Sequence, residues 1–201
     1  PAIGLCAGAI VGWITTRFAP EAAGSGIPHL KGVLIHLRKL KPLPLIPVKF
    51  VAGVFGIGAG LSLGREGPTV QMAASIGEGW ARLFKLRPGD HRALLAAGAG
   101  AGLAAAFNAP LAGAIFVFEE LVRRFELRVA VATLAACSGG LVVMRTLIGD
   151  HVVFAVPPMV LDLFPGYFLC LAFGMVMGAL GVLYSHMVVA GLDMAEHMRR
   201  I

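Results

Sequence analysis

Long stretches without a charged side chain constrain this chain more than any other feature. Lys, Arg, Asp, Glu and His are absent from residues 1–16, 93–118, 129–144 and 163–185. A helix needs ~20 predominantly apolar residues to cross the hydrocarbon core of a bilayer. The composition agrees, because 14% of the residues are charged, whereas soluble domains carry about a quarter. We therefore predict an integral, multi-pass membrane protein in which some helices span the bilayer and others enter it only in part.

The net charge of +6 comes from Lys and Arg residues in the connections between the apolar stretches. Such clusters are typical of membrane interfaces and cytoplasmic loops. They are not interleaved with aromatic residues on a polar surface, so nucleic-acid binding is not expected. The three cysteines lie far apart and the six histidines show no ligand spacing. We therefore expect neither a disulfide framework nor a metal or cofactor site.

The sequence Gly-Arg-Glu-Gly-Pro at residues 64–68 places two charges inside apolar sequence. Ionised side chains at membrane depth are costly and usually functional. Pro68 suits the first turn of a helix, where unpaired N–H groups attract an anion. Two interpretations stay open. Either Glu66 is a helix-start acid paired with Arg65, or its carboxylate competes with a free anion and leaves the site when protonated, which would make a gate controlled by a proton.

A second glycine-flanked loop, Gly-Ser-Gly-Ile-Pro at residues 24–28, precedes another predicted helix start. The Ser25 hydroxyl can donate one hydrogen bond, and the N–H groups of Gly26 and Ile27 can add to it. The alternative is that Ser25 is only a helix N-cap. Two such loops in one membrane chain favour an anion site, because helix starts at bilayer depth mark substrate sites in transporters.

The uncharged stretch 93–118 is long enough to span a bilayer, but Phe-Asn-Ala-Pro at residues 107–110 interrupts it. Pro110 disfavours helix at Ala109 and can begin a new helix. We predict two short helices with a break between them, and a single kinked helix is the alternative. Irregular backbone at this depth is tolerated only where protein or a water-filled cavity covers it.

Two acids, Glu119 and Glu120, follow near the expected C-terminal end of the second short helix. Acids are unfavourable there, because that end carries a negative partial charge. One interpretation is an interfacial pair that faces Arg123 and Arg124. The other is a proton carrier.

The remaining stretches predict further packed helices. Glycines at four-residue spacing, as at Gly4, Gly8 and Gly12, allow close helix packing. We expect Lys49 to extend its ammonium to the membrane interface. Helices are expected over residues 1–18, 68–84, 127–148 and 166–200, and a further helix is expected from the prolines near residue 42 to residue 63. A short helix and a basic connection are expected over 29–41. Residues 149–165 are expected to form a loop in which Asp150, His151 and Asp162 are solvated.

Three stretches together resemble signature motifs of the CLC chloride channels and proton-coupled chloride transporters. They are GSGIP at 24–28, GREGPTVQ at 64–71 and GLAAAFNAPLAG at 102–113, and their order, their spacing and the acid pair after the third also agree. The resemblance implies an all-α, polytopic membrane bundle with broken and partly spanning helices. Residues 1–201 would form only the N-terminal half of the transmembrane domain, one half of an inverted repeat.

The resemblance also implies a membrane location, a homodimer and a transport unit that is incomplete in residues 1–201. CLC proteins are homodimers in a lipid bilayer, and we expect the same of the full-length protein, in a bacterial inner membrane. The second CLC half supplies a GxFxP loop and a coordinating tyrosine, and neither is found here. We expect the chain to be a piece of a longer protein that does not transport alone.

Residue roles follow from the matching motifs. Ser25 corresponds to the serine that contacts the central chloride, and the loops imply a chloride site that includes Gly26, Ile27, Arg65, Glu66 and Gly67. Glu66 corresponds to the gating glutamate, which moves away when protonated and also passes the proton. Glu120 corresponds to the internal proton acceptor of exchangers, and Glu119 to an acid that helps water reach it.

Proton/chloride exchange is the function that these residues predict, with a passive voltage-gated chloride channel as the alternative. An intramembrane enzyme is a third hypothesis, because a serine between glycines is superficially similar to a protease nucleophile. We find no histidine in a matching helical context, no HExxH zinc motif and no GxSxG nucleophile elbow. We therefore predict no enzymatic activity and no catalytic residue.

Overall fold

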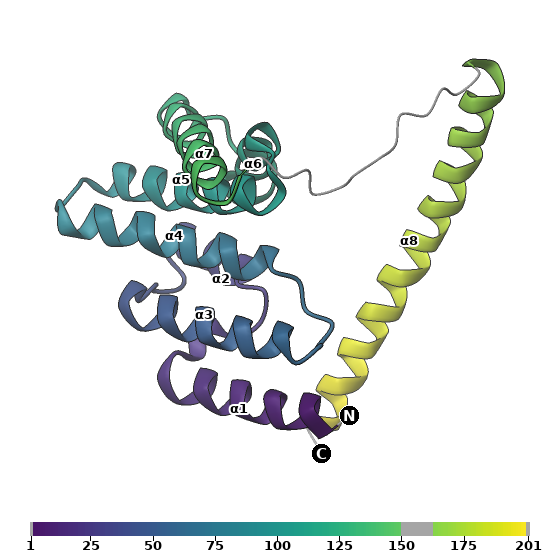
Figure 1. The fold of residues 1–201 in the computed structure, drawn as a ribbon, viewed down its shortest axis with the longest axis horizontal. Helices are drawn as coiled ribbons and strands as arrows, with labels where there is room; N and C mark the ends of the chain where they lie inside the picture. Colours follow the sequence, from purple (N-terminus) through teal and green to yellow (C-terminus); the bar gives the residue numbers. More distant parts are fainter. Residues whose placement is uncertain (1, 150–162, 200–201) are drawn as a thin grey trace. The chain divides into compact units, whose positions relative to one another are not determined.

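The computed structural model describes residues 2–149 and 163–199, and within those ranges every regular element is helical (Figure 1). The α-helices are α1 (Ala2–Phe18), α2 (Ile27–Leu34), α3 (Pro42–Gly58), α4 (Glu66–Leu83), α5 (Pro88–Phe107), α6 (Pro110–Phe116), α7 (Leu127–Ile148) and α8 (Leu163–Arg199). Two shorter elements are the 3-10 helix η1 (Pro20–Ala22) and the π-helix η2 (Val117–Val122). The predicted all-α fold class is confirmed.

The chain divides into two compact units, Pro1–Phe154 with α1 to α7 and Ala155–Ile201 with α8. In the first unit α3 packs against both α1 and α4, α4 against α5, and α5 against α7, as Figure 1 shows. The core lies where α2 to α5, η2 and α7 meet, and its fully buried side chains include Leu30, Leu45, Val70, Val117 and Val129.

Glycines let the backbones of α4 and α5 touch. A Cβ atom added at Gly98 would lie 2.3 Å from the carbonyl oxygen of Ala73, and one added at Gly77 would lie 2.2 Å from that of Leu94. The predicted glycine stripe of the first helix is not used in this way, because a Cβ added at Gly8 or Gly12 meets nothing within 4 Å. Close packing therefore falls on α4 and α5, which carry the second and third motifs.

Two of the described helices are long and apolar enough to cross a bilayer by length and composition. They are Leu127–Ile148, which is α7, and Gly166–Met194, within α8. The helices α1 and α3 are apolar but shorter. Length alone thus agrees with a bundle in which some helices span and others do so only in part.

The predicted break near residue 109 is confirmed. Helix α5 ends at Phe107, Asn108 adopts the left-handed conformation with φ 55°, and α6 begins at Pro110. The left-handed residue reverses the chain and the proline starts the next helix. The alternative of a single kinked helix is wrong.

Several boundaries differ from the predictions. Helix α8 begins at Leu163, inside the expected loop 149–165, and not at residue 166. Helix α3 ends at Gly58 rather than residue 63, because the chain turns at Gly60, whose φ is 78°. Helix α4 begins at Glu66, two residues before Pro68, so the proline lies in the first turn but does not open it. Helix α2 likewise begins at Ile27 rather than at residue 29. The predicted solvated residues Asp150, His151 and Asp162 lie outside the described residues.

Candidate functional site

The two glycine-flanked loops meet in the folded chain. A Cβ atom added at Gly67 would lie 2.4 Å from the carbonyl oxygen of Ser25 and 3.0 Å from its Cα. Gly67 is buried and lies in the first turn of α4, while Ser25 lies two residues before α2. The N-terminal ends of two helices are therefore held in direct backbone contact, although 42 residues of sequence separate Ser25 from Gly67.

A cavity of about 630 Å³ opens beside this contact. Its walls come from α1, the loop before α2, α3 and the loop that leads into α4. Four of the predicted chloride-site residues line it, namely Ser25, Ile27, Glu66 and Gly67. Two helix starts with unpaired N–H groups at one cavity make an electropositive environment that suits a small anion.

Gly26 lies against the protein interior. It is the N-cap of α2 with φ 86°, and a Cβ atom there would lie 2.5 Å from the side-chain oxygen of Gln71. Gln71 is buried and its Nε2 donates to the carbonyl oxygen of Glu21 at 2.8 Å. Since Gly26 is the cap and makes no side-chain capping bond, the alternative that Ser25 is merely an N-cap is wrong. Ser25 is exposed, so its hydroxyl can donate a hydrogen bond to a ligand.

Arg65 and Glu66 point to different partners. The Arg65 guanidinium donates through Nη2 to the carbonyl oxygen of Ala106 at 3.0 Å, near the C-terminal end of α5. The ion pairs found among the described residues do not join Arg65 to Glu66. The Glu66 carboxylate instead folds back over Gly64, where an added Cβ would lie 2.2 Å from Oε2. The interpretation of Glu66 as an acid paired with Arg65 is therefore wrong.

Lys49 lines the cavity and does not reach the membrane interface, so its predicted position is wrong. Its side chain is buried, and its ammonium donates to the carbonyl oxygens of Ala22 at 2.7 Å and Gly24 at 2.6 Å. The ammonium does not extend to an interface, because these carbonyls in η1 and the following loop satisfy it inside the protein. Lys49 lines the same cavity as Glu66. One feature of the sequence could have indicated this burial. Lys49 is a single charge with uncharged residues on both sides of it.

The two acids after α6 lie in the π-helix η2. Glu120 forms an ion pair through Oε1 with the Lys31 ammonium of α2, so its partner is neither Arg123 nor Arg124 as one interpretation had it. Glu119 is exposed. Neither acid is among the residues that line the cavity. Helix α2 nevertheless connects the two places, because its first residue, Ile27, lines the cavity and Lys31 follows one turn later.

Among the described residues, no group of three or more His, Cys, Asp and Glu side chains could hold a metal ion. The chemistry available at the cavity is therefore that of two helix starts, one carboxylate, one buried ammonium and the hydroxyls of Thr15, Ser25 and Ser62. Such a site can bind an anion and can exchange it for the carboxylate.

Comparisons with known proteins agree with this arrangement. Residues 7–201 match the family model described as voltage gated chloride channel. An H(+)/Cl(-) exchange transporter ClcA of Citrobacter koseri is 42% identical over 194 residues, which cover 94% of this chain and 41% of the relative. A ClcA of Vibrio vulnificus is 40% identical over 190 residues, which cover 92% and 40% respectively.

A solved structure is also similar. The X-ray crystal structure of a slow cyanobacterial Cl-/H+ antiporter superimposes with a TM-score of 0.81 at 35% sequence identity, over 89% of this chain and 43% of the other. The chain thus spans about two-fifths of the length of the proteins that it matches.

Proposed function

Because this chain belongs to the voltage-gated chloride channel family, we propose that its full-length protein exchanges chloride for protons across a membrane. The cavity beside the Ser25–Gly67 contact supplies the first-half part of the chloride site. The observation that carries the proposal is that Glu66 lines the same cavity as the starts of α2 and α4. A single ion can then meet both helix starts and the carboxylate.

Chloride binding at this cavity rests on backbone N–H groups. The first turns of α2 and α4 leave N–H groups without helical partners, and Ser25 adds its hydroxyl. The backbone is what contributes at Gly26, Ile27, Arg65 and Gly67. For Arg65 this follows because its side chain donates to the Ala106 carbonyl oxygen. The buried Lys49 ammonium adds a positive charge to the wall of the cavity.

Glu66 acts as the gate in this proposal. Its carboxylate and a chloride ion carry the same charge, so both cannot occupy one electropositive site without repulsion. Protonation removes the charge of the carboxylate and lets chloride enter. The protonated Glu66 side chain then passes its proton on in one direction while chloride moves in the other. This exchange couples the two fluxes.

Glu120 receives the proton on the internal side, and the exposed Glu119 keeps water beside it. The names of the similar proteins describe exchange, and the presence of both Glu66 and Glu120 supports the same choice over a passive channel. The bilayer partner is supported by large exposed apolar side chains on α7, which are Val131, Leu134, Val142, Val143 and Leu147. We further propose a homodimer in a bacterial inner membrane.

The test is transport by the full-length protein in liposomes. An imposed chloride gradient should change the pH of the lumen, and Glu66→Gln should abolish that change while chloride still moves. Glu120→Gln should also uncouple protons from chloride. Proton movement that persists in Glu66→Gln would refute the gate, and proton flux unaltered in Glu120→Gln would favour the channel alternative.

A further inference from the structure

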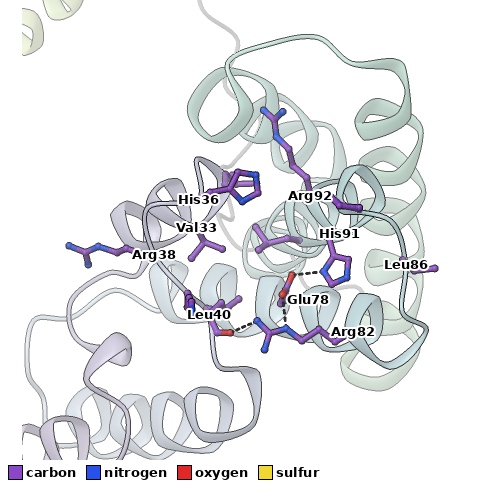
Figure 2. A pocket seen from close by; sticks show the side chains of 13 residues that line it. Val33, His36, Arg38, Leu40, Glu78, Arg82, Leu86, His91 and Arg92 are labelled. Atoms are coloured by element: carbon purple, nitrogen blue, oxygen red, sulfur yellow. Dashed lines mark hydrogen bonds and ion pairs between the residues drawn. The ribbon is translucent and has the colours of Figure 1, made fainter.

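A second cavity, which we call the basic corner cavity, lies where the loop between α2 and α3 meets the connection between α4 and α5 (Figure 2). It has a volume of about 330 Å³ and shares no lining residue with the cavity beside Ser25. Small-molecule sites begin at about 300 Å³. The basic corner cavity is therefore large enough for a phosphate group with its nearest substituents.

Positive charge dominates the lining of the basic corner cavity. Lys39, Arg82 and Arg92 contribute cations, and Glu78 is the one carboxylate among the lining residues. Arg38 also belongs to the lining, but Figure 2 shows its guanidinium pointing away from the other labelled side chains. Figure 2 shows Glu78 between Arg82 and His91. Arg82 Nε donates to Glu78 Oε1 at 2.7 Å, so this pair is neutral overall. Lys39 and Arg92 are not balanced by any acid of the lining.

Arg92 keeps one donor without an acceptor. Arg92 pairs through Nη1 with Oε1 of Glu126 at 3.1 Å, and Glu126 does not line the cavity. The Arg92 Nε is buried without a hydrogen-bond partner. A buried donor without an acceptor costs about 1–3 kcal/mol, so Arg92 lacks an acceptor that a ligand oxygen can supply.

The N-terminus of α5 lies at the basic corner cavity. Pro88, His91 and Arg92 are in or next to the first turn of α5, and all three line the cavity. The N–H groups of Asp90 and His91 donate to the Arg87 carbonyl oxygen, so this helix end contributes its partial positive charge and not free backbone donors. Asp90 lies in the same turn, but it is paired with Arg128 and does not line the cavity.

We propose that the basic corner cavity binds a phosphate group, carried either by an anionic lipid headgroup or by a free phosphate compound. Arginine and lysine together form charge-assisted bonds to phosphate oxygens, and a guanidinium can offer two parallel donors. Basic pockets between membrane helices bind phosphate headgroups in this way. The apolar side chains of Val33 and Leu95 in the lining tolerate the carbon atoms next to the phosphate.

The experiment uses the full-length protein and two probes. Phosphatidylglycerol binding is measured by native mass spectrometry after release from mixed micelles, with phosphatidylcholine as the neutral reference. Binding of inorganic phosphate is measured by calorimetry. Chloride transport is not the readout, so failure of this proposal and failure of proton/chloride exchange are distinguishable.

The site variant is Lys39→Gln with Arg92→Gln. Its matched control is Lys85→Gln with Arg87→Gln, which removes the same charge from the neighbouring connection but from residues outside the lining. The site variant should weaken phosphatidylglycerol or phosphate binding about tenfold or more, since charge-assisted bonds are lost, and the control should leave it within about twofold of the parent. Loss for the lipid alone identifies a headgroup, and loss for inorganic phosphate identifies a free phosphate compound.

Two results overturn the proposal. One is equal loss in the site variant and the control, which would mean diffuse attraction. The other is that neither probe binds the parent protein. If the site variant does not fold, Lys39→Gln alone changes only a residue of the loop before α3, and Lys85→Gln alone is its control.

Discussion

Gly67 and Ser25 are in backbone contact. A Cβ atom added to Gly67 would lie 2.4 Å from the Ser25 carbonyl oxygen. Real Cβ atoms do not approach a backbone oxygen so closely, and neither backbone can yield without moving a helix start. The contact thus fixes α2 and α4 relative to each other at the cavity. It also explains why a residue with no side chain follows Glu66.

Gly67→Ala should therefore disrupt the cavity. Overpacking a tight contact costs about 1–3 kcal/mol, so we expect a lower thermal midpoint of the full-length protein and weaker chloride binding. Gly8→Ala is the matched control, because a Cβ there meets nothing within 4 Å and alanine favours helix by up to about 1 kcal/mol. Equal thermal midpoints for the two variants would contradict the contact.

Gly64→Ala tests the position of the Glu66 carboxylate without disturbing the backbone. The added Cβ would lie 2.2 Å from Glu66 Oε2, at the end of a flexible side chain that can rotate away. We expect the thermal midpoint to stay close to that of the parent while the pH dependence of chloride binding changes. An unchanged pH dependence would mean that the carboxylate does not occupy the place seen here.

Lys49→Met should destabilise the protein. The ammonium donates to the carbonyls of Ala22 and Gly24, and leaving buried acceptors without a donor costs about 1–3 kcal/mol. Thermal unfolding of the full-length protein in detergent measures the effect. Lys85→Met, at an exposed position, is the control and should leave the midpoint nearly unchanged. A similar midpoint for both variants would show that the buried ammonium is dispensable.

If Glu120 receives the proton as proposed, Lys31→Met should alter proton transport. The ammonium is paired with the Glu120 carboxylate, and an adjacent cation favours the ionised form of a carboxylate. Without that cation the carboxylate takes up a proton more readily, so the pH at which proton flux is half-maximal should rise. Lys31→Arg keeps the charge and should behave as the parent does. If the pH of half-maximal proton flux is the same in Lys31→Met as in the parent, Lys31 does not influence proton uptake.

The helices were predictable where the signals are local. The bounds of α7, Leu127–Ile148, coincide with those expected from an uncharged stretch, and Pro110 marks the start of α6. The π-helix Val117–Val122 was not predicted, because its residues continue a helical pattern and the change in hydrogen bonding has no composition of its own. The residues predicted for the chloride site lie around one cavity or next to it, but sequence alone does not bring α2 and α4 together.

The ionic partners could not be predicted for the same reason. Lys31 and Glu120 are 89 residues apart in the sequence, and Lys49 meets carbonyl groups that any residues could have supplied. Near neighbours such as Arg123 were the natural candidates for Glu120. Pairing across the bundle is decided by tertiary packing, and only the fold shows it.

Chloride binding to the full-length protein, measured by calorimetry at several pH values, tests the central claim most directly. If Glu66 competes with the ion for the cavity beside Ser25, parent protein should bind chloride more tightly as the pH falls, and Glu66→Gln should bind tightly at every pH. If Glu66→Gln binds chloride with the same affinity and the same pH dependence as the parent, the carboxylate does not share the site and the account is wrong.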